Sequence, residues 1–506
     1  MRGVVAAGHP LTASAGADVL RAGGNAVDAA VAAVLMSFAA ESPLTGPGAG
    51  GFMLVTSTQG ESHLLEFFVG APGCGLADPA PSPLVPIEVA FSPEAIQIFN
   101  VGPSSCGVYG TAAGLSRALE RFGTVALGDL TAPAARAARE GVEVTPIQEY
   151  LLEILGPIFR STEEGTALYE PHGRPACAGE RLRMPDLADL LDRVGGEGPG
   201  FLHEGDVADA VSDWVLERGG LLTRDDLAAY EVVEREPVRA SFRGRQVVTN
   251  PPPSSGGILI ADALELLARI DRPGDTEALA EVIASTNQAR DREFLLGLGD
   301  EGYVERFLDP AKLDAVAGEI GSRLGSTTHV SVMDADGGCA TVTCSNGSCS
   351  GVVVPGTGVH LNNMLGEEDL NPAGFHNHAP GARVPSMMAP TVVLRDGVPE
   401  IALGSAGSNR IRSAIVQTVA AVVDGGLDAQ AAVDSPRLHV EGALVDAEPG
   451  VDPKALSALR ERGWDLRQWR ERNLYFGGVQ AVARTAEGSV TGGGDPRRGG
   501  VALLVE

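Results

Sequence analysis

The chain has 506 residues, of which 44% are hydrophobic and 21% are charged. These fractions are ordinary for a globular protein and exclude a disordered or fibrous one. The formal net charge of −28 repels nucleic-acid phosphates and anionic lipid headgroups, so we expect neither nucleic acid nor a membrane among its partners. The length predicts about three domains at ~150 residues each. No internal repeat or flexible linker divides the sequence, however, which favours one compact body.

The sequence lacks the patterns of an exported or membrane-spanning chain. Its longest apolar stretch, residues 26–40, is interrupted by Asp28 and Ser37 and is shorter than the ~18 residues of a membrane span, so it predicts a buried helix. The chain opens Met-Arg-Gly-Val-Val, without a signal-peptide pattern. No CxxC pair occurs among the six cysteines, and we expect free thiols in a reducing cytoplasm.

The first part of the chain predicts two helices and then two short strands. Residues 12–22 form an Ala/Leu-rich helical run that Gly23 can end in a left-handed conformation. Asn25 is expected to cap a second helix that reaches about Ala40. A glycine-rich bend follows, and the two strands are predicted at 52–55 and 63–69.

Helices dominate the middle of the sequence and strands its last third. Helical spacing of apolar residues is clearest at 182–194, 207–218 and 258–270. After Gly325, short β-branched runs separated by Gly, Asp and Asn predict strands at 328–333, 339–344, 391–394, 400–403 and 479–483. This order of helices and strands predicts packed sheets covered by helices.

The most informative stretch is a predicted hairpin at 325–345. Two alternating runs flank the turn sequence Asp334-Ala-Asp-Gly-Gly338. A turn centred on Asp336 would place Thr327 opposite Ser345, and a slip of one residue would change that partner.

Thr327 could act as a nucleophile if a base removed its hydroxyl proton. No Ser/His/Asp arrangement is evident, and His329 lies only two residues further along the same strand. Cleavage of the Ser326–Thr327 bond would give Thr327 an α-amino group with a pKa near ~8 beside its own hydroxyl. A Thr-Thr pair is also typical of ordinary β-strand preference, and this pattern alone favours that interpretation.

Several motifs along the chain accompany this stretch. The segments are Ala7-Gly-His-Pro10, Gly23-Gly-Asn-Ala-Val-Asp-Ala-Ala30, Gly50-Gly-Phe-Met53, Pro251-Pro-Pro-Ser-Ser-Gly-Gly257, Ser326-Thr-Thr-His-Val-Ser331, Leu361-Asn-Asn363, Ser386-Met-Met-Ala-Pro390 and Gly404-Ser-Ala-Gly-Ser408. With them the sequence resembles the γ-glutamyltransferase family of N-terminal-nucleophile hydrolases over nearly its whole length. The resemblance implies an α/β fold, a four-layer αββα sandwich. It also implies self-cleavage before Thr327 into a helix-rich large subunit, residues 1–326, and a strand-rich small subunit, residues 327–506.

The same resemblance assigns the catalytic residues. Thr327 would be the nucleophile and its amine the general base, and Ser345 stands where the family has a second threonine that hydrogen-bonds the nucleophile. Gly407 and Ser408 occupy the two glycine positions whose backbone N–H groups form the oxyanion hole. A serine fits there if the residue need not adopt a positive φ. The resemblance implies transfer of an acyl group to water or an amine without metal or organic cofactor.

The substrate-binding positions depart from the family pattern. Phe68 stands where the family has an arginine that clamps the α-carboxylate of a γ-glutamyl group, and the paired serines behind it are Ser386-Met387 here. The α-amino group is held in the family by a Gln or Glu and an Asp, which are Met364 and Glu367 here. The stretch after Ser345 also departs from the usual Thr-x-Asn. The candidate substrate-binding residues are therefore Phe68, Asn346, Met364, Glu367, Ser386 and Met387.

These departures leave several hypotheses open. An apolar pocket wall favours a small-molecule amide less polar than a γ-glutamyl group, whereas Arg383 or Arg410 could take over the carboxylate and keep a γ-glutamyl substrate. The alternatives are an acylase or C–C hydrolase that uses the same nucleophile, and an uncleaved binding protein without catalysis.

Overall fold

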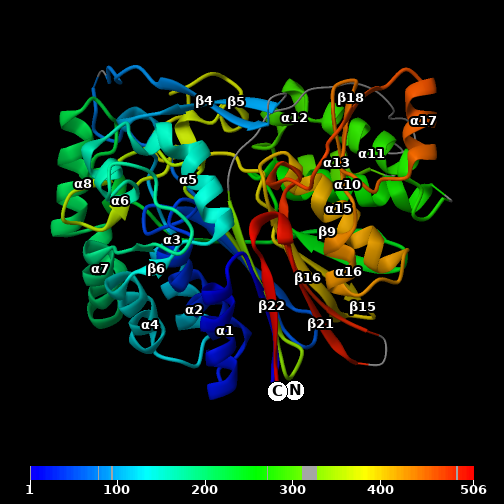
Figure 1. Cartoon of the computed structure of the whole chain (residues 1–506), viewed down its shortest axis with the longest axis horizontal. Helices are drawn as coiled ribbons and strands as arrows, with labels where there is room; N and C mark the ends of the chain where they lie inside the picture. Colours follow the sequence, from blue (N-terminus) through cyan, green and yellow to red (C-terminus); the bar gives the residue numbers. More distant parts are fainter. Residues whose placement is uncertain (1, 78, 93–94, 271, 310–326, 486–487) are drawn as a thin grey trace.

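The fold consists of two facing β-sheets with helices on both outer sides (Figure 1). The computed structural model describes residues 2–77, 79–92, 95–270, 272–309, 327–485 and 488–506. Ser326, on one side of the expected cleavage bond, lies outside the described residues, and Thr327 lies within them. This arrangement is the four-layer αββα sandwich that the resemblance implies.

The first sheet has seven strands, and every neighbouring pair is antiparallel. Its order is β22 (Val501–Val505), β1 (Gly3–Ala7), β11 (Thr328–Asp334), β12 (Cys339–Ser345), β2 (Gly50–Thr56), β3 (Ser62–Phe67) and β8 (Val233–Arg235). Strands from the beginning, middle and end of the chain therefore lie side by side in one sheet.

The second sheet has six antiparallel strands. Its order is β21 (Val490–Gly494), β20 (Gly478–Arg484), β16 (Val398–Ala406), β15 (Thr391–Arg395), β10 (Arg245–Thr249) and β9 (Val238–Phe242). Other strands lie outside the two sheets: β4 (Val85–Ser92), β5 (Ala95–Val101), β6 (Val142–Glu143), β7 (Arg181–Leu182), β13 (Val353–Val354), β14 (Val359–His360), β17 (Leu438–Glu441), β18 (Leu444–Ala447) and β19 (Asp465–Gln468).

Helices cover the outer face of each sheet (Figure 1). On the side of the first sheet lie α1 (Pro10–Ala22), α2 (Ala26–Ala40), α3 (Thr111–Phe122), α4 (Leu127–Glu140), α5 (Pro146–Phe159), α6 (Glu163–Tyr169), α7 (Pro185–Glu197), α8 (Asp206–Glu217) and α9 (Arg224–Ala228). On the other side lie α10 (Ser255–Arg269), α11 (Thr276–Ala289), α12 (Arg292–Gly297), α13 (Tyr303–Phe307), α15 (Arg410–Val423), α16 (Ala429–Asp434) and α17 (Pro453–Glu461).

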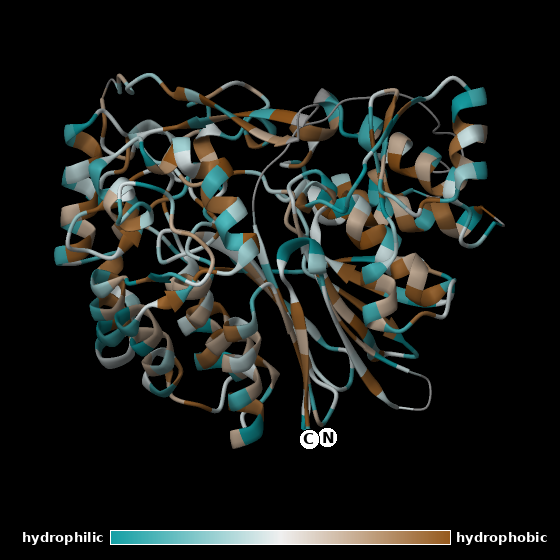
Figure 2. Cartoon of the chain, in the orientation of Figure 1, coloured by the Kyte–Doolittle hydropathy of each residue, from teal (hydrophilic) through white to brown (hydrophobic). Residues whose placement is uncertain are grey.

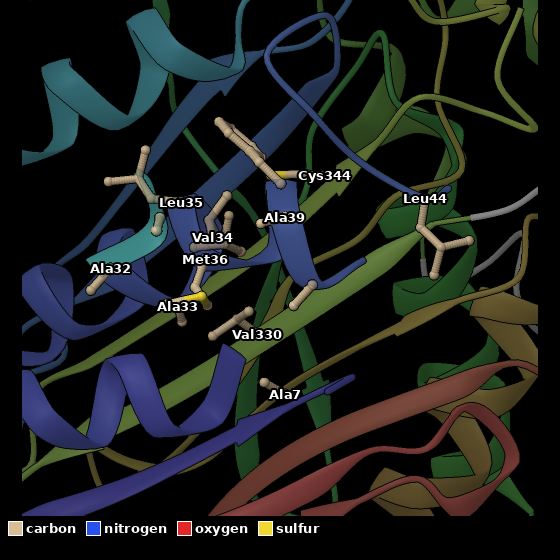
Figure 3. Packing of buried hydrophobic residues seen from close by; sticks show 14 of the residues in the cluster. Ala7, Ala32, Ala33, Val34, Leu35, Met36, Ala39, Leu44, Val330 and Cys344 are labelled. Atoms are coloured by element: carbon tan, nitrogen blue, oxygen red, sulfur yellow. The ribbon is translucent and has the colours of Figure 1, made fainter. Parts of the chain in front are cut away.

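The two-residue period of β1 shows how the sheets are buried on both faces. Val5 and Ala7 point toward the helices and join the core cluster around α2 (Figure 3), whereas Val4 and Ala6 join the cluster between the sheets. Hydrophobic residues accordingly lie along the sheets and on the helix faces that cover them (Figure 2).

Helix α2 confirms the buried helix predicted at 26–40, since all of its residues are buried. Asn25 caps it, as predicted, by accepting hydrogen bonds from the backbone N–H groups of Val27 and Asp28. Among the described residues, none of the helices combines the length and apolar character needed to cross a bilayer. The expectation of a helical beginning is wrong, because the chain opens with β1 inside the first sheet.

Candidate active site

The predicted hairpin is present with the predicted register. Thr328 pairs with Cys344 at the start of β11, so the preceding Thr327 lies beside Ser345 at the end of β12. On its other side Ser345 pairs with Gly50 of β2. Thr327 is 4% exposed. Both hydroxyl groups thus lie at the same end of the neighbouring strands β11 and β12.

A small cavity of about 30 Å³ lies at this end of the strands, between the two halves of the sandwich. Because one water molecule needs roughly 10–15 Å³, the cavity holds little more than one or two waters with the side chains as they lie. Eight of the predicted site residues line it: Phe68, Thr327, Ser345, Met364, Glu367, Ser386, Met387 and Ser408. The sequence interpretation missed five others: Gly347, Asp369, Leu370, Met388 and Ile411.

Asn346 and Gly407 are predicted site residues that do not line this cavity. The backbone of Asn346 ties two loops together, because its N–H donates to the carbonyl of Leu44 and its carbonyl accepts from the N–H of Asn363. Gly407 directly precedes Ser408 in the turn between β16 and α15. A Cβ on Gly407 would lie 2.9 Å from Cα of Gly477, and its φ of +115° also favours glycine.

Ser408 adopts a conformation that usually belongs to glycine. Its φ is +48°, so the condition under which a serine would fit freely at this position is not met. A non-glycine residue in this region costs roughly 1–2 kcal/mol. The side chain of Ser408 compensates with a hydrogen bond, since its Oγ donates to Oδ2 of Asp369 at 3.2 Å.

Part of the cavity lining is apolar where the family pattern has a cation. Phe68 is fully buried and stacks on Phe52, with 5.3 Å between ring centroids. Met364 and Met387 continue this wall, and both are nearly fully buried. Methionine side chains are flexible, so this wall can adapt its shape to an apolar group. Neither arginine nor lysine lines the cavity among the described residues.

The two arginines considered as replacements for the family's clamp make contacts outside the cavity, although the guanidinium nitrogens of the buried Arg410 have no hydrogen-bond partner among the described residues. Nη1 of Arg383 donates to the backbone carbonyl of Phe68 at 2.8 Å, and its guanidinium lies over the ring of Tyr230 at 4.4 Å. The guanidinium of Arg410 lies over the ring of Tyr475 at 4.2 Å, and Glu441 is its ion-pair partner at 3.8 Å. Neither side chain therefore reaches the cavity lining.

Two carboxyl groups are among the polar side chains that line the cavity. Burial raises the pKa of Glu367 to about 8, and the nearby Asp369 adds to this shift. Burial also raises the pKa of Asp369 to about 6, against the favourable charges of Arg290, Arg410 and Arg412. At neutral pH Glu367 is therefore mostly protonated and can both donate and accept a hydrogen bond, whereas Asp369 is mostly ionised.

His329 does not serve as the base for Thr327. Its Nδ1 lies 2.8 Å from Oγ1 of Thr343 and its Nε2 2.8 Å from Oγ1 of Thr341, inside the core. Burial lowers its pKa to about 3, so the ring stays neutral. In the part of the chain that the structure describes, no three His, Cys, Asp or Glu residues group as metal ligands. All six cysteines are free thiols.

Comparisons with known proteins agree over nearly the whole chain. The model of the gamma-glutamyltranspeptidase family matches residues 12–505. The acylase ACY 1 proenzyme of Pseudomonas sp. (strain SE83) is 32% identical over 100% of this chain and 94% of its own length. The glutathione hydrolase proenzyme of Escherichia coli (strain K12) is 30% identical over 98% of this chain and 90% of its own. The crystal structure of a cephalosporin acylase from Bacillus halodurans superposes with a TM-score of 0.83 and 27% identity, covering 100% and 96% of the two chains.

Proposed function

Because the chain belongs to the gamma-glutamyltranspeptidase family of self-processing hydrolases and acyltransferases, we propose that it is an acylase with Thr327 as nucleophile. Its substrate is an amide whose acyl group lacks the α-carboxylate of a γ-glutamyl group. The observation that carries this proposal is the wall of Phe68, Met364 and Met387, which stands where an arginine clamp would be needed.

The proposed reaction begins with the chain itself. Cleavage before Thr327 frees an amine with a pKa near ~8, which is suited to accept the proton of the neighbouring hydroxyl. Oγ1 of Thr327 then attacks the acyl carbonyl, the backbone N–H groups of Gly407 and Ser408 stabilise the oxyanion, and the protonated amine gives its proton to the leaving group. Such an oxyanion hole contributes on the order of 3 kcal/mol per donor. Water or an acceptor amine finally releases the acyl group from the ester.

The charges around the cavity favour an acyl group without a carboxylate. A substrate carboxylate placed beside Asp369 would be repelled, and no lining cation among the described residues would compensate for its desolvation. An apolar acyl chain suits the chemistry of the methionine and phenylalanine wall, which must move to admit it because the cavity is only about 30 Å³. A hydrogen-bond donor on that chain would suit Glu367 and Asp369. The acylase names of two of the relatives support this choice, although the glutathione hydrolase relatives are about as similar in sequence.

The self-cleavage step can be tested by mass. Intact-mass spectrometry of the purified chain should show two pieces, the smaller beginning at Thr327, and Thr327→Ala should remain a single chain. A wild-type chain that stays uncut on long incubation would contradict the proposal and favour a binding protein. The cytoplasmic location expected from the sequence stays a prediction.

The acyl preference can be tested with matched p-nitroanilides. We expect kcat/KM for butyryl- and phenylacetyl-p-nitroanilide to exceed that for γ-glutamyl-p-nitroanilide by at least tenfold, because an Arg–carboxylate pair is worth roughly 1.5–3 kcal/mol per charged hydrogen bond. Phe68→Arg should move this ratio toward the γ-glutamyl substrate, whereas Phe68→Leu should not. Hydrolysis of glutathione by the wild type with a micromolar KM would show that the pocket still accepts γ-glutamyl groups.

A further inference from the structure

We propose that Asp369 is a positioning residue that holds the oxyanion-forming peptide in place through the side chain of Ser408. This inference rests on the proposed function. It concerns the backbone N–H groups that would stabilise the oxyanion formed when Thr327 attacks the acyl carbonyl. It adds a second element, the short 3₁₀-helix η4 (Glu368–Leu370), to the machinery at the turn between β16 and α15.

The turn needs an additional restraint because of its backbone. Gly407 and Ser408 are consecutive residues with positive φ, at +115° and +48°. Glycine adopts such angles without cost, but a serine is driven toward negative φ by its Cβ. A change of φ at Ser408 would change the orientation of its peptide N–H relative to the cavity that Ser408 and Thr327 both line.

The hydrogen bond from Ser408 to Asp369 supplies that restraint. Ser408 Oγ donates to Oδ2 of Asp369 at 3.2 Å across 39 residues of sequence. The Asp369 side chain is 9% exposed, so water competes little for this bond. The serine therefore gains a fixed partner in its positive-φ conformation.

Asp369 is itself held from behind by arginines. Nη2 of Arg290, at the end of α11, donates to the backbone carbonyl of Asp369 at 2.5 Å, and its Nη1 lies 4.0 Å from Oδ1. Arg410 and Arg412 in the first turn of α15 add positive charge near the same carboxyl group. Cations are unfavourable at a helix N-terminus, so an anion at Asp369 also stabilises the start of α15.

Other charged groups surround Ser408 and Asp369, and the variants used in a test should leave these groups unchanged. Glu367 and Glu368 flank Asp369 on its own segment, and Glu441 on β17 faces Arg410. Replacing Asp369 changes the balance of this whole cluster, whereas replacing Ser408 removes only the hydroxyl. The most specific test is therefore made at Ser408.

The experiment compares Ser408→Ala with Ser408→Gly in the processed enzyme, using the p-nitroanilide that the wild type cleaves best. Alanine keeps the steric preference of a Cβ against positive φ but loses the hydrogen bond that opposes it, while glycine needs no restraint. We expect kcat of Ser408→Ala to be about tenfold below that of Ser408→Gly, with KM changed less than twofold between them. Asp369→Ala should lower kcat in the wild-type background by a similar factor and much less in the Ser408→Gly background. Asp369→Asn, whose amide oxygen can still accept from Ser408, should lose less than Asp369→Ala.

The outcomes separate the inference from the function on which it rests. Equal kcat for the alanine and glycine variants at 408, or equal losses from Asp369→Ala in both backgrounds, would overturn the positioning role. Mainly KM effects of Asp369→Ala would instead assign Asp369 to substrate contact. If Asp369→Ala unfolds early in a thermal melt, the pair at 408 still decides. A wild type that forms no acyl-enzyme at Thr327 would refute the proposed function itself.

Discussion

At the scale of single residues, the active-site cavity combines an apolar wall with a carboxyl group that resists ionisation. Glu367 is 6% exposed, and burial raises its pKa from about 4.5 to about 8. Between these two pH values the unfolded chain releases the proton that the folded chain keeps. Folding is thus stabilised by the proton below about pH 4.5 and loses this contribution as the pH rises through about 8.

We therefore predict that Glu367→Gln stabilises the protein selectively at alkaline pH. The amide imitates the protonated carboxyl group, so the penalty of ionising a buried acid disappears, an effect of up to roughly 5 kcal/mol. Thermal melts in the Thr327→Ala background should coincide at pH 4 and show a higher Tm for the variant at pH 8.5. The exposed neighbour provides the control, Glu368→Gln, which should follow the parent at both pH values. Parallel curves for parent and Glu367→Gln would contradict the buried-acid explanation.

The residues of the site differ in how far sequence could predict them. The pairing of Thr327 with Ser345 followed from local alternation around an Asp/Gly turn, and the register confirms it. The contact of Ser408 with Asp369 could not be foreseen, because it joins segments 39 residues apart and depends on a backbone angle. Asp369 could not be singled out either. In the sequence it belongs to an acidic run, and such runs ordinarily face solvent.

At the scale of elements, hydrogen bonds to Asp28 hold the N-terminus of α2 in place. Asp28 is fully buried and accepts hydrogen bonds from the backbone N–H groups of Asn25, Thr124 and Val125 and from the hydroxyl of Thr124. One carboxylate thus completes the cap of α2 and fixes the loop that follows α3. The sequence indicated the cap, because Asn and Asp stand at the preferred spacing, but not the second loop.

We predict that Asp28→Ala destabilises the chain by roughly 3 kcal/mol, since four partly buried donors lose their acceptor. Because Asp28 lies outside the catalytic cavity, kcat of the folded variant should stay close to that of the wild type. Chemical denaturation and steady-state kinetics measure the two quantities separately. Asp18→Ala, which removes an exposed ion pair on α1, should change neither the stability nor kcat. A similar loss of stability in both variants would contradict the role assigned to Asp28.

Strand β1 shows why the beginning of the chain was misjudged. Its five residues, Gly3–Ala7, are small and apolar and are buried on both faces, so they lack the alternation that marks a half-exposed strand. Only their place between β11 and β22 makes them a strand, and that place depends on partners more than 300 residues away. The helices that follow carry their own capping and spacing signals, which is why they were predicted well.

At the scale of the whole molecule, both sheets are built from the two sides of position 327. In the first sheet, β1, β2, β3 and β8 come from the earlier part and β11, β12 and β22 from the later part. In the second sheet, β9 and β10 belong to the earlier part and the other four strands to the later one. The order of the strands, unlike their existence, depends on long-range packing that no local pattern reports.

This interleaving predicts that the two pieces of the processed chain do not separate without unfolding. They should elute together in size-exclusion chromatography, also in 1 M salt, because backbone ladders and apolar cores join them rather than surface charges. They should lose their structure in one transition on denaturation. Free folded fragments in high salt would contradict the interleaved arrangement as the basis of their association.

The neighbourhood of β1 and β22 has a consequence for how this protein could be built. These strands pair antiparallel from Gly3 with Val505 to Ala7 with Val501, so the start of one lies next to the end of the other, and the chain ends meet in Figure 1. A short glycine linker could join them, and the gene could be reopened in front of Thr327. Such a circular permutant would carry its threonine directly behind the initiator methionine. Once that methionine is trimmed, the amine would be free from the outset, and catalysis could be studied apart from maturation.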